Sequence, residues 1–293
     1  MKKTIFVGSG VAIVTPFKDD KVDYIKLGEL IEYQISMRTD CIVICGTTGE
    51  ASTMPDSEHL ATIEFAVNKV AKRVPVVAGA GSNDTMHAVH LSRSAKELGV
   101  DAILSVTPYY NKTTQEGLYR HFSHIADNVD IPMIMYNVPS RTNLNINPDT
   151  VARLAAHPNI YGLKECNINQ VGEILATCPT DFSVYSGEDA LVVPMLSLGA
   201  YGVISVMANI VPTETHEIVM KFLAGDILGS REIQLRLIPL VNALFSETSP
   251  IPIKAAMNLL GFDIGECRLP LVPLSEKGRA QLEKELRSLR MIN

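Results

Sequence analysis

The strongest constraint on the fold is a series of eight short apolar segments that alternate with stretches carrying apolar residues at helical spacing. The strand-like segments are 10–14, 41–45, 74–78, 102–106, 133–136, 161–164, 183–185 and 203–206, and amphipathic stretches such as 24–37, 57–71, 85–98, 115–128 and 190–198 lie between them. Strands that are apolar on both faces need cover on both sides, which parallel β-α repeats supply through right-handed crossovers. Eight such repeats close naturally into a barrel. We therefore predict the α/β class and a (β/α)8 TIM barrel. A doubly wound open sheet is the alternative, but no G-x-G-x-x-G turn follows any of the strands.

The pattern changes after residue 214, where strand-like segments stop and helical ones continue. The remaining helical stretches are 218–223, 230–245, 253–260 and 276–289. We predict a barrel domain over residues 1–225 and a C-terminal helical domain over residues 226–293. In a barrel of this kind the chemistry belongs at the carboxyl ends of the strands.

The charge of the chain argues against nucleic-acid and membrane partners. It has 26 Lys and Arg residues against 32 Asp and Glu residues, a formal net charge of −6, and no clustered basic run that would hold phosphate backbones or anionic lipids. Residues 2–14 resemble a short signal sequence, but Gly8 and Gly10 interrupt them. The uncharged stretch 190–213 is long enough to span a bilayer, but Pro194 and Gly199 break it. We predict neither a signal peptide nor a membrane span.

The cysteines favour a reducing compartment. They are five in number, an odd count, and contain no C-x-x-C pair or nearby histidine at a spacing that builds a metal site. We expect free thiols, a cytoplasmic location and no metal.

Among the strand ends, Lys164 is the most unusual residue, because it closes an apolar strand whereas nearly all other lysines lie on amphipathic helices or in turns. Burial disfavours the ammonium form, and a lysine pKa lowered from about 10.4 to near 7 corresponds to roughly 4 to 5 kcal/mol. A neutral amine is the nucleophile that forms an imine with a ketone or aldehyde. The alternative is a lysine that extends from the barrel mouth to a carboxylate such as Glu165. Lys254 is a rival nucleophile, but it lies in the helical C-terminal region, where a structural role fits better.

Imine chemistry also needs groups that move protons. Tyr136 ends the strand before that of Lys164, and neighbouring strands of a barrel place the phenol near the amine. Thr47 and Tyr110 could extend a relay of hydroxyl groups toward water. The alternatives are a core tyrosine with a satisfied hydroxyl, and a Thr47-Thr48 pair that caps the next turn.

Two further loops suggest the charge of the substrate. Arg141 follows Tyr136 at the barrel mouth, where its planar guanidinium suits a carboxylate, with a surface ion pair as the alternative. Barrel enzymes commonly bind phosphate at the loops after strands seven and eight, yet strand seven is followed by Gly187-Glu188-Asp189, whose carboxylates repel phosphate. A small substrate with a carboxylate and no phosphate is favoured.

Together the strand ends resemble those of the dihydrodipicolinate synthase family, one of the pyruvate-dependent class I aldolases, which also include the N-acetylneuraminate lyases. The resemblance covers essentially the whole chain. Its motifs are Gly46-Thr47-Thr48-Gly49-Glu50, Thr107-Pro108-Tyr109-Tyr110-Asn111, Tyr136-Asn137-Val138-Pro139-Ser140-Arg141-Thr142 and Gly202-Val203-Ile204-Ser205-Val206.

The resemblance implies a role for each residue at the strand ends. Lys164 matches the imine-forming lysine and Tyr136 the proton-relaying phenol, which Thr47 links to Tyr110 from a neighbouring subunit. Arg141 matches the residue that binds the carboxylate of aspartate semialdehyde. Thr48, Ile204 and Gly187 match substrate-binding positions.

The implied enzyme is a 4-hydroxy-tetrahydrodipicolinate synthase, a carbon-oxygen lyase. It condenses pyruvate with L-aspartate 4-semialdehyde, the first committed step toward diaminopimelate and lysine. It needs no cofactor, because the imine nitrogen is the electron sink. The family is usually a homotetramer formed from two dimers. The alternatives are a pyruvate lyase or aldolase of the N-acetylneuraminate lyase type, against which Arg141 argues, and a catalytically silent ligand-binding barrel, against which the intact reactive residues argue.

Two departures from the family pattern have consequences. After Lys164-Glu165 the family commonly continues with Ala, then Ser or Thr, then Gly, whereas this chain has Cys166-Asn167-Ile168. At the site where lysine inhibits some members, His87 replaces an acidic residue and Asp56 replaces a histidine, while Ala51, Ser52, His59, Asn83 and Tyr109 align with it. A histidine cannot pair with an ammonium group, so we predict weak or absent inhibition by lysine.

Overall fold

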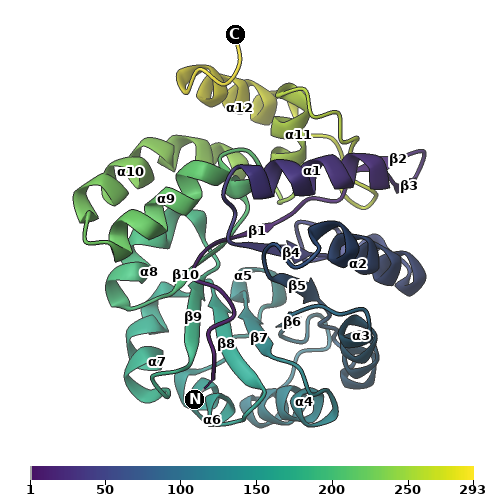
Figure 1. Cartoon of the computed structure of the whole chain (residues 1–293), viewed down its shortest axis with the longest axis vertical. Coiled ribbons are helices and arrows are strands. Elements are labelled where there is room, and N and C mark those ends of the chain that lie inside the picture. The colour runs from purple at the N-terminus through teal and green to yellow at the C-terminus, as the bar shows by residue number, and fades with distance from the viewer. Residues whose placement is uncertain (1) are drawn as a thin grey trace.

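A computed structural model describes residues 2–293. Eight parallel strands form a closed barrel in the order β1-β10-β9-β8-β7-β6-β5-β4 (Figure 1). Their bounds are β1 (Gly8–Ala12), β4 (Cys41–Ile44), β5 (Val76–Gly79), β6 (Ala102–Val106), β7 (Met133–Asn137), β8 (Ile160–Glu165), β9 (Ser183–Ser186) and β10 (Gly202–Ser205). The predicted (β/α)8 barrel is confirmed, and each strand ends within two residues of its predicted position.

Side-chain alternation separates the inside of the barrel from its outer surface. Residues such as Val43, Ile134 and Tyr136 form one cluster inside the barrel, where Phe6 stacks on Tyr185 with ring centroids 4.4 Å apart. The neighbouring residue on β8, Leu163, belongs instead to the larger core between the strands and the helices. On β8, therefore, residue 164 faces the interior, and the residues on either side of it face the helices.

Helices cover the outer surface of the barrel, as the predicted repeats require. Their bounds are α1 (Tyr24–Ser36), α2 (Asp56–Val70), α3 (Thr85–Glu97), α4 (Gln115–Asn128), α5 (Pro139–Thr142), α6 (Pro148–Ala155), α7 (Val171–Thr177), α8 (Val192–Leu198) and α9 (Pro212–Leu223). Asp23 and Thr114 accept hydrogen bonds from the first turns of α1 and α4, which explains where these helices begin.

Some local structure differs from the sequence prediction. The stretch expected as one helix over 190–198 begins as a 3-10 turn (Asp189–Leu191) and becomes α8 only at Val192. The short helices α5, α6 and α7 and a hairpin formed by β2 (Phe17–Lys18) and β3 (Lys21–Val22) were not predicted. The helices among these elements are shorter than the roughly 11 to 18 residues over which a helical period is sought, and the two strands have only two residues each.

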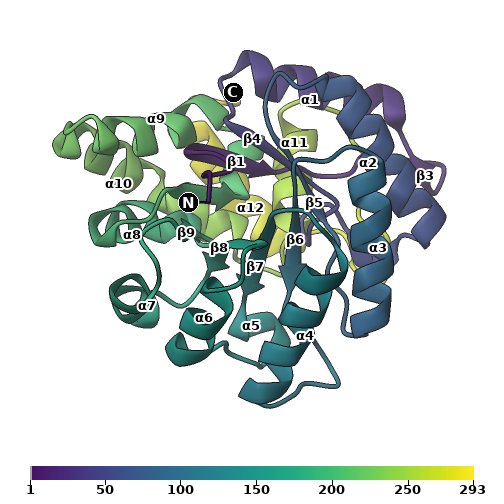
Figure 2. The ribbon, with the colours of Figure 1, turned by 60° about the horizontal axis from the view of Figure 1, so that its bottom comes forward.

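The chain ends in the predicted helical extension, formed by α10 (Ile227–Leu244), α11 (Ile251–Leu259) and α12 (Glu276–Ser288). Helix α10 packs on α9, and α12 packs on α10 and α11. Figure 1 and Figure 2 show α11 and α12 together beside the barrel. The domain boundary at residue 225 stays a prediction. Within residues 2–293, no helix combines the length and apolar character needed to cross a membrane.

Candidate active site

Lys164 lies inside the barrel next to Tyr136. The two residues are paired on neighbouring strands β8 and β7, and Lys164 Nζ lies 4.4 Å from the centre of the phenol ring. Both side chains are buried, with 6% of Lys164 and 7% of Tyr136 exposed. Burial lowers the pKa of the Lys164 amine from its ordinary value, although Cys166, Asp189 and Glu188 oppose this effect. This direction favours the neutral amine, which is the form that attacks a carbonyl.

The structure rules out the carboxylate partner considered for Lys164. The Glu165 carboxylate lies on the outer surface of β8, where it accepts hydrogen bonds from Asn137, Gln170 and the backbone of Asn167. Because strand neighbours face opposite sides, Glu165 cannot receive the amine of Lys164.

Lys254, the rival nucleophile, is fully engaged in structural contacts. Its Nζ donates to Glu50 Oε1 at 2.9 Å and to the carbonyl oxygens of Thr15 and Glu266 at 3.0 and 2.8 Å. An ammonium with three acceptors has no lone pair to offer. The structural role expected for Lys254 therefore agrees with its contacts.

A cavity of about 270 Å³ opens beside Lys164 at the carboxyl ends of the strands. Six of the eight predicted site residues line it: Lys164, Tyr136, Thr47, Thr48, Arg141 and Gly187. Ile204 does not line this cavity and is instead buried in the cluster inside the barrel. Tyr110 is 92% exposed and does not line it either.

Tyr110 lies on the loop after β6 with a positive φ of 70°. Its neighbour Tyr109 lines a different cavity, described below. Within one chain, the hydroxyl of Tyr110 therefore lies outside the cavity of Lys164. The role of Tyr110 across a subunit interface stays a prediction.

Gly187 leaves the space that the Lys164 side chain and its neighbour Cys166 occupy. A Cβ atom at this position would collide with Cys166 Sγ and lie 3.3 Å from Lys164 Cε. Any larger residue here would therefore push against Cys166 and against the end of the Lys164 side chain that carries the amine. The thiol of Cys166, the first departure from the family pattern, fills the remaining space beside Gly187, and burial raises its pKa to about 12.

The two acidic residues that follow Gly187 differ in role. Glu188 lines the cavity, and burial raises the pKa of its carboxyl. Asp189 instead accepts hydrogen bonds from the backbone of Val206 and Met207 at 3.1 and 2.8 Å, and so holds the loop after β10. The expectation that both carboxylates face the substrate was therefore wrong for Asp189.

Arg141 lies at the mouth of the cavity and is anchored from the C-terminal part of the chain. Its Nη2 donates to the carbonyl oxygen of Ser249 at 3.0 Å. Phe245, Glu247 and Thr248 also line the cavity. Sequence reasoning missed this wall, because residues between two C-terminal helices show no pattern that points to a strand end a hundred residues earlier.

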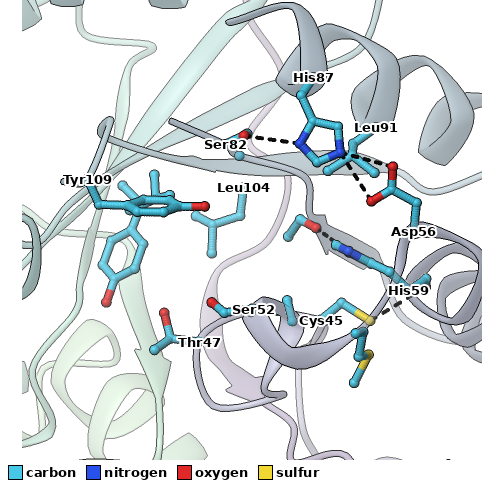
Figure 3. Close-up of a pocket in the computed structure, with 17 residues that line it drawn as sticks. Cys45, Thr47, Ser52, Asp56, His59, Ser82, His87, Leu91, Leu104 and Tyr109 are labelled. Carbon is cyan, nitrogen blue, oxygen red and sulfur yellow. Dashed lines mark hydrogen bonds and ion pairs between the residues drawn. The ribbon is translucent and has the colours of Figure 1, made fainter. Parts of the chain in front are cut away.

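A second cavity, of about 210 Å³, shares part of its lining with the first (Figure 3). Tyr136, Thr47 and Leu104 line both cavities. In the second one, His87 Nε2 lies 3.0 and 3.1 Å from the two carboxylate oxygens of Asp56. Most residues that the resemblance assigns to the inhibitor site line it, namely Ala51, Ser52, Asp56, His59, His87 and Tyr109. The two residues that depart from the family pattern at this site, His87 and Asp56, therefore contact each other.

Comparison with known proteins identifies the relatives of this chain. The model of the dihydrodipicolinate synthetase family matches residues 5–289. This chain belongs to the dihydrodipicolinate synthetase family. The 4-hydroxy-tetrahydrodipicolinate synthase of Acetivibrio thermocellus is 62% identical over 292 residues, which cover 100% of both chains. The family and the enzymatic nature predicted from the strand ends are confirmed.

Solved structures agree with this assignment. The crystal structure of dihydrodipicolinate synthase from Aquifex aeolicus is 47% identical, with a TM-score of 0.96 over 98% of this chain and 99% of that one. The synthase of Acinetobacter baumannii, whose structure was solved in complex with pyruvate, is 43% identical, with a TM-score of 0.96 over 99% of this chain and 100% of that one. The fold around the cavity is thus that of the family.

Proposed function

We propose that this chain is a 4-hydroxy-tetrahydrodipicolinate synthase that binds pyruvate covalently through Lys164 and condenses it with L-aspartate 4-semialdehyde. The observation that carries the proposal is the buried amine of Lys164 beside Tyr136 at the base of a cavity with an arginine at its mouth. The names of its relatives and the pyruvate complex of the related synthase agree with it.

The reaction begins with the neutral amine of Lys164, which attacks C2 of pyruvate to form a carbinolamine. Loss of water gives the imine, and loss of a proton from C3 gives an enamine. C3 of the enamine then attacks the aldehyde carbon of the semialdehyde. The amine of the semialdehyde displaces Lys164 and closes the ring, which frees the lysine for the next cycle.

Tyr136 is the group that moves protons in these steps. Its burial raises the pKa of the phenol well above the ordinary value, so the hydroxyl stays protonated at neutral pH. A neutral phenol both donates and accepts a hydrogen bond, which suits a relay that passes protons on instead of storing charge. Thr47, which lines the same cavity, is the next hydroxyl in this relay.

Two further residues that line the cavity bind the carboxylates of the substrates. Thr48 holds the carboxylate of pyruvate, and Arg141 holds that of the semialdehyde, with Ser249 orienting its guanidinium. Gly187 leaves room for Lys164. Ile204 does not line the cavity, and its part in binding pyruvate rests on the resemblance alone. Glu188 disfavours phosphorylated substrates, because a carboxylate and a phosphate repel each other.

The proposal includes the assembly implied by the resemblance and the location predicted from the cysteines. A homotetramer would allow Tyr110, almost fully exposed in one chain, to reach the relay of a neighbour. A cytoplasmic location suits the five cysteines, all of which are free.

The test is to incubate the protein with pyruvate and borohydride and to locate the modified residue by mass spectrometry, alongside an assay of condensation with the semialdehyde. We expect a reduced adduct on Lys164 and condensation activity. An adduct without condensation would indicate a pyruvate lyase, and no adduct would indicate a silent barrel. An adduct on Lys254 would refute the assignment of the nucleophile.

A further inference from the structure

A buried cluster of amides and one carboxylate lies on the outer surface of β7 and β8, directly behind the reactive pair. Asn137 Nδ2 donates to the two oxygens of Glu165 at 2.8 and 3.0 Å. Gln170 Nε2 donates to Glu165 Oε2 at 2.8 Å, and the backbone of Asn167 donates to Oε1 at 2.7 Å. Asn137 and Glu165 are both fully buried. The reaction outlined above uses none of these side chains.

The position of this cluster in the sheet suggests its purpose. Asn137 is paired with Glu165 across the two strands, and the adjacent pair is Tyr136 with Lys164. The pairing of β7 with β8 is irregular between Met133 and Ile134. The Asn137–Glu165 hydrogen bonds therefore lie beyond the irregularity, at the strand ends where register matters for the site.

Register is critical here because a slip by one residue exchanges the two faces of a strand. Such a slip on β8 would turn Lys164 toward the helices and bring Glu165 into the barrel. A smaller shift would move the amine of Lys164 away from the phenol of Tyr136. In the structure Nζ lies 4.4 Å from the centre of that ring.

We propose that Asn137 and Glu165 are positioning residues, whose cross-strand hydrogen bonds hold the ends of β7 and β8 in the register that places Tyr136 against Lys164. The proposal rests on the proposed function, because it assigns a task relative to these two reactive groups. Asn137 is itself fixed, since its Oδ1 accepts a hydrogen bond from the backbone of Ile146 at 3.0 Å.

The contacts explain why a carboxylate occupies position 165. Its hydrogen-bond partners, Asn137, Asn167 and Gln170, all donate N–H groups to it. A carboxylate accepts in every direction, whereas a glutamine would turn its own NH2 group toward one of these donors. The isosteric substitution Glu165→Gln therefore disturbs the cross-strand bonds without changing the volume of the buried side chain.

The test compares Glu165→Gln with Glu173→Gln, an exposed residue on α7 that serves as the control. For each variant, one sample is labelled to completion at Lys164 with pyruvate and borohydride to count the competent sites. A second, unlabelled sample is assayed for condensation, and its turnover number is expressed per competent site. We expect complete labelling but a turnover per site reduced by about 10- to 100-fold in Glu165→Gln, because small displacements of catalytic groups have effects of this size. The control should match the parent protein.

A second variant supports the test if Glu165→Gln does not fold. Asn137→Ser removes the cross-strand amide but leaves Glu165 with Gln170 and Asn167, and it should lower turnover per competent site in the same way. The double variant Asn137→Asp/Glu165→Gln restores a hydrogen bond from an amide to a carboxylate across the two strands. It should recover part of the turnover that Glu165→Gln loses.

The outcomes are distinct. If the variants lose competent sites and thermal stability while turnover per competent site is unchanged, the cluster is merely structural and the proposal is wrong. If the parent protein takes no label at Lys164, the proposed function fails instead.

Discussion

The buried ion pair between Lys254 and Glu50 should be among the most sensitive points of the fold. Their side chains are 2% and 0% exposed, and the amine and carboxylate lie 2.9 Å apart. The second oxygen of Glu50 accepts a hydrogen bond from the backbone of Arg268 at 2.9 Å, so the pair joins the loop after β4 to two C-terminal segments. Lys254→Met keeps the length of the side chain but leaves Glu50 as a buried charge without its cation.

Breaking one partner of such a pair typically costs about 3 to 5 kcal/mol, because the remaining charge stays out of water. At about 2 to 4 °C for each kcal/mol in proteins approaching this size, we expect the melting temperature to fall by roughly 6 to 20 °C. Thermal unfolding followed by circular dichroism measures this change. The double variant with Glu50→Gln should lose less than the sum of the two single variants, since both remove the same interaction.

Lys69→Met is the matched control, because Lys69 forms an exposed ion pair with Glu32 at 2.9 Å. Exposed pairs contribute little to stability, so its melting temperature should stay close to that of the parent protein. Equal effects of Lys254→Met and Lys69→Met would refute the reasoning that burial determines the cost. Pyruvate labelling of Lys164 should persist in folded Lys254→Met protein.

Three further predictions concern the site. Tyr136→Phe removes the relaying hydroxyl and should lower kcat by about 10²- to 10⁴-fold, as measured by steady-state condensation; unchanged kcat would exclude the relay. If Tyr110 completes the site of a neighbouring subunit, Tyr110→Phe should lose activity while Tyr109→Phe retains it, and the reverse result would exchange their roles. Lysine should inhibit weakly or not at all, because the Asp56 carboxylate is engaged by His87; half-inhibition at low-millimolar lysine would contradict this, and His87→Glu should increase sensitivity.

Much of the barrel could be predicted from the sequence, because the alternation of apolar segments and amphipathic helices repeats through most of its length. The approach of Tyr136 to Lys164 was also predictable, since neighbouring parallel strands end at the same edge of the barrel. Helix α6 was missed although its buried residues Thr150, Val151, Leu154 and Ala155 recur at helical spacing, because its eight residues are fewer than the roughly 11 to 18 over which such a period is sought. The wall formed by Phe245 and Ser249 was missed because no local pattern says where a connection between two helices lies.

The contacts of Glu165 show that residues adjacent in the sequence need not be partners in the site. Glu165 follows Lys164 directly and was therefore considered as its partner, but alternation along a strand separates the two completely. The contacts of Glu165 instead come from Asn137, 28 positions earlier, and from Gln170, five positions later. Hydrogen bonds between such residues depend on the register of two strands and on the path of a loop, neither of which leaves a periodic trace in the sequence. A reactive lysine can therefore be recognised from its unusual place at the end of an apolar strand, whereas the groups that hold it there become visible only when the strands are paired.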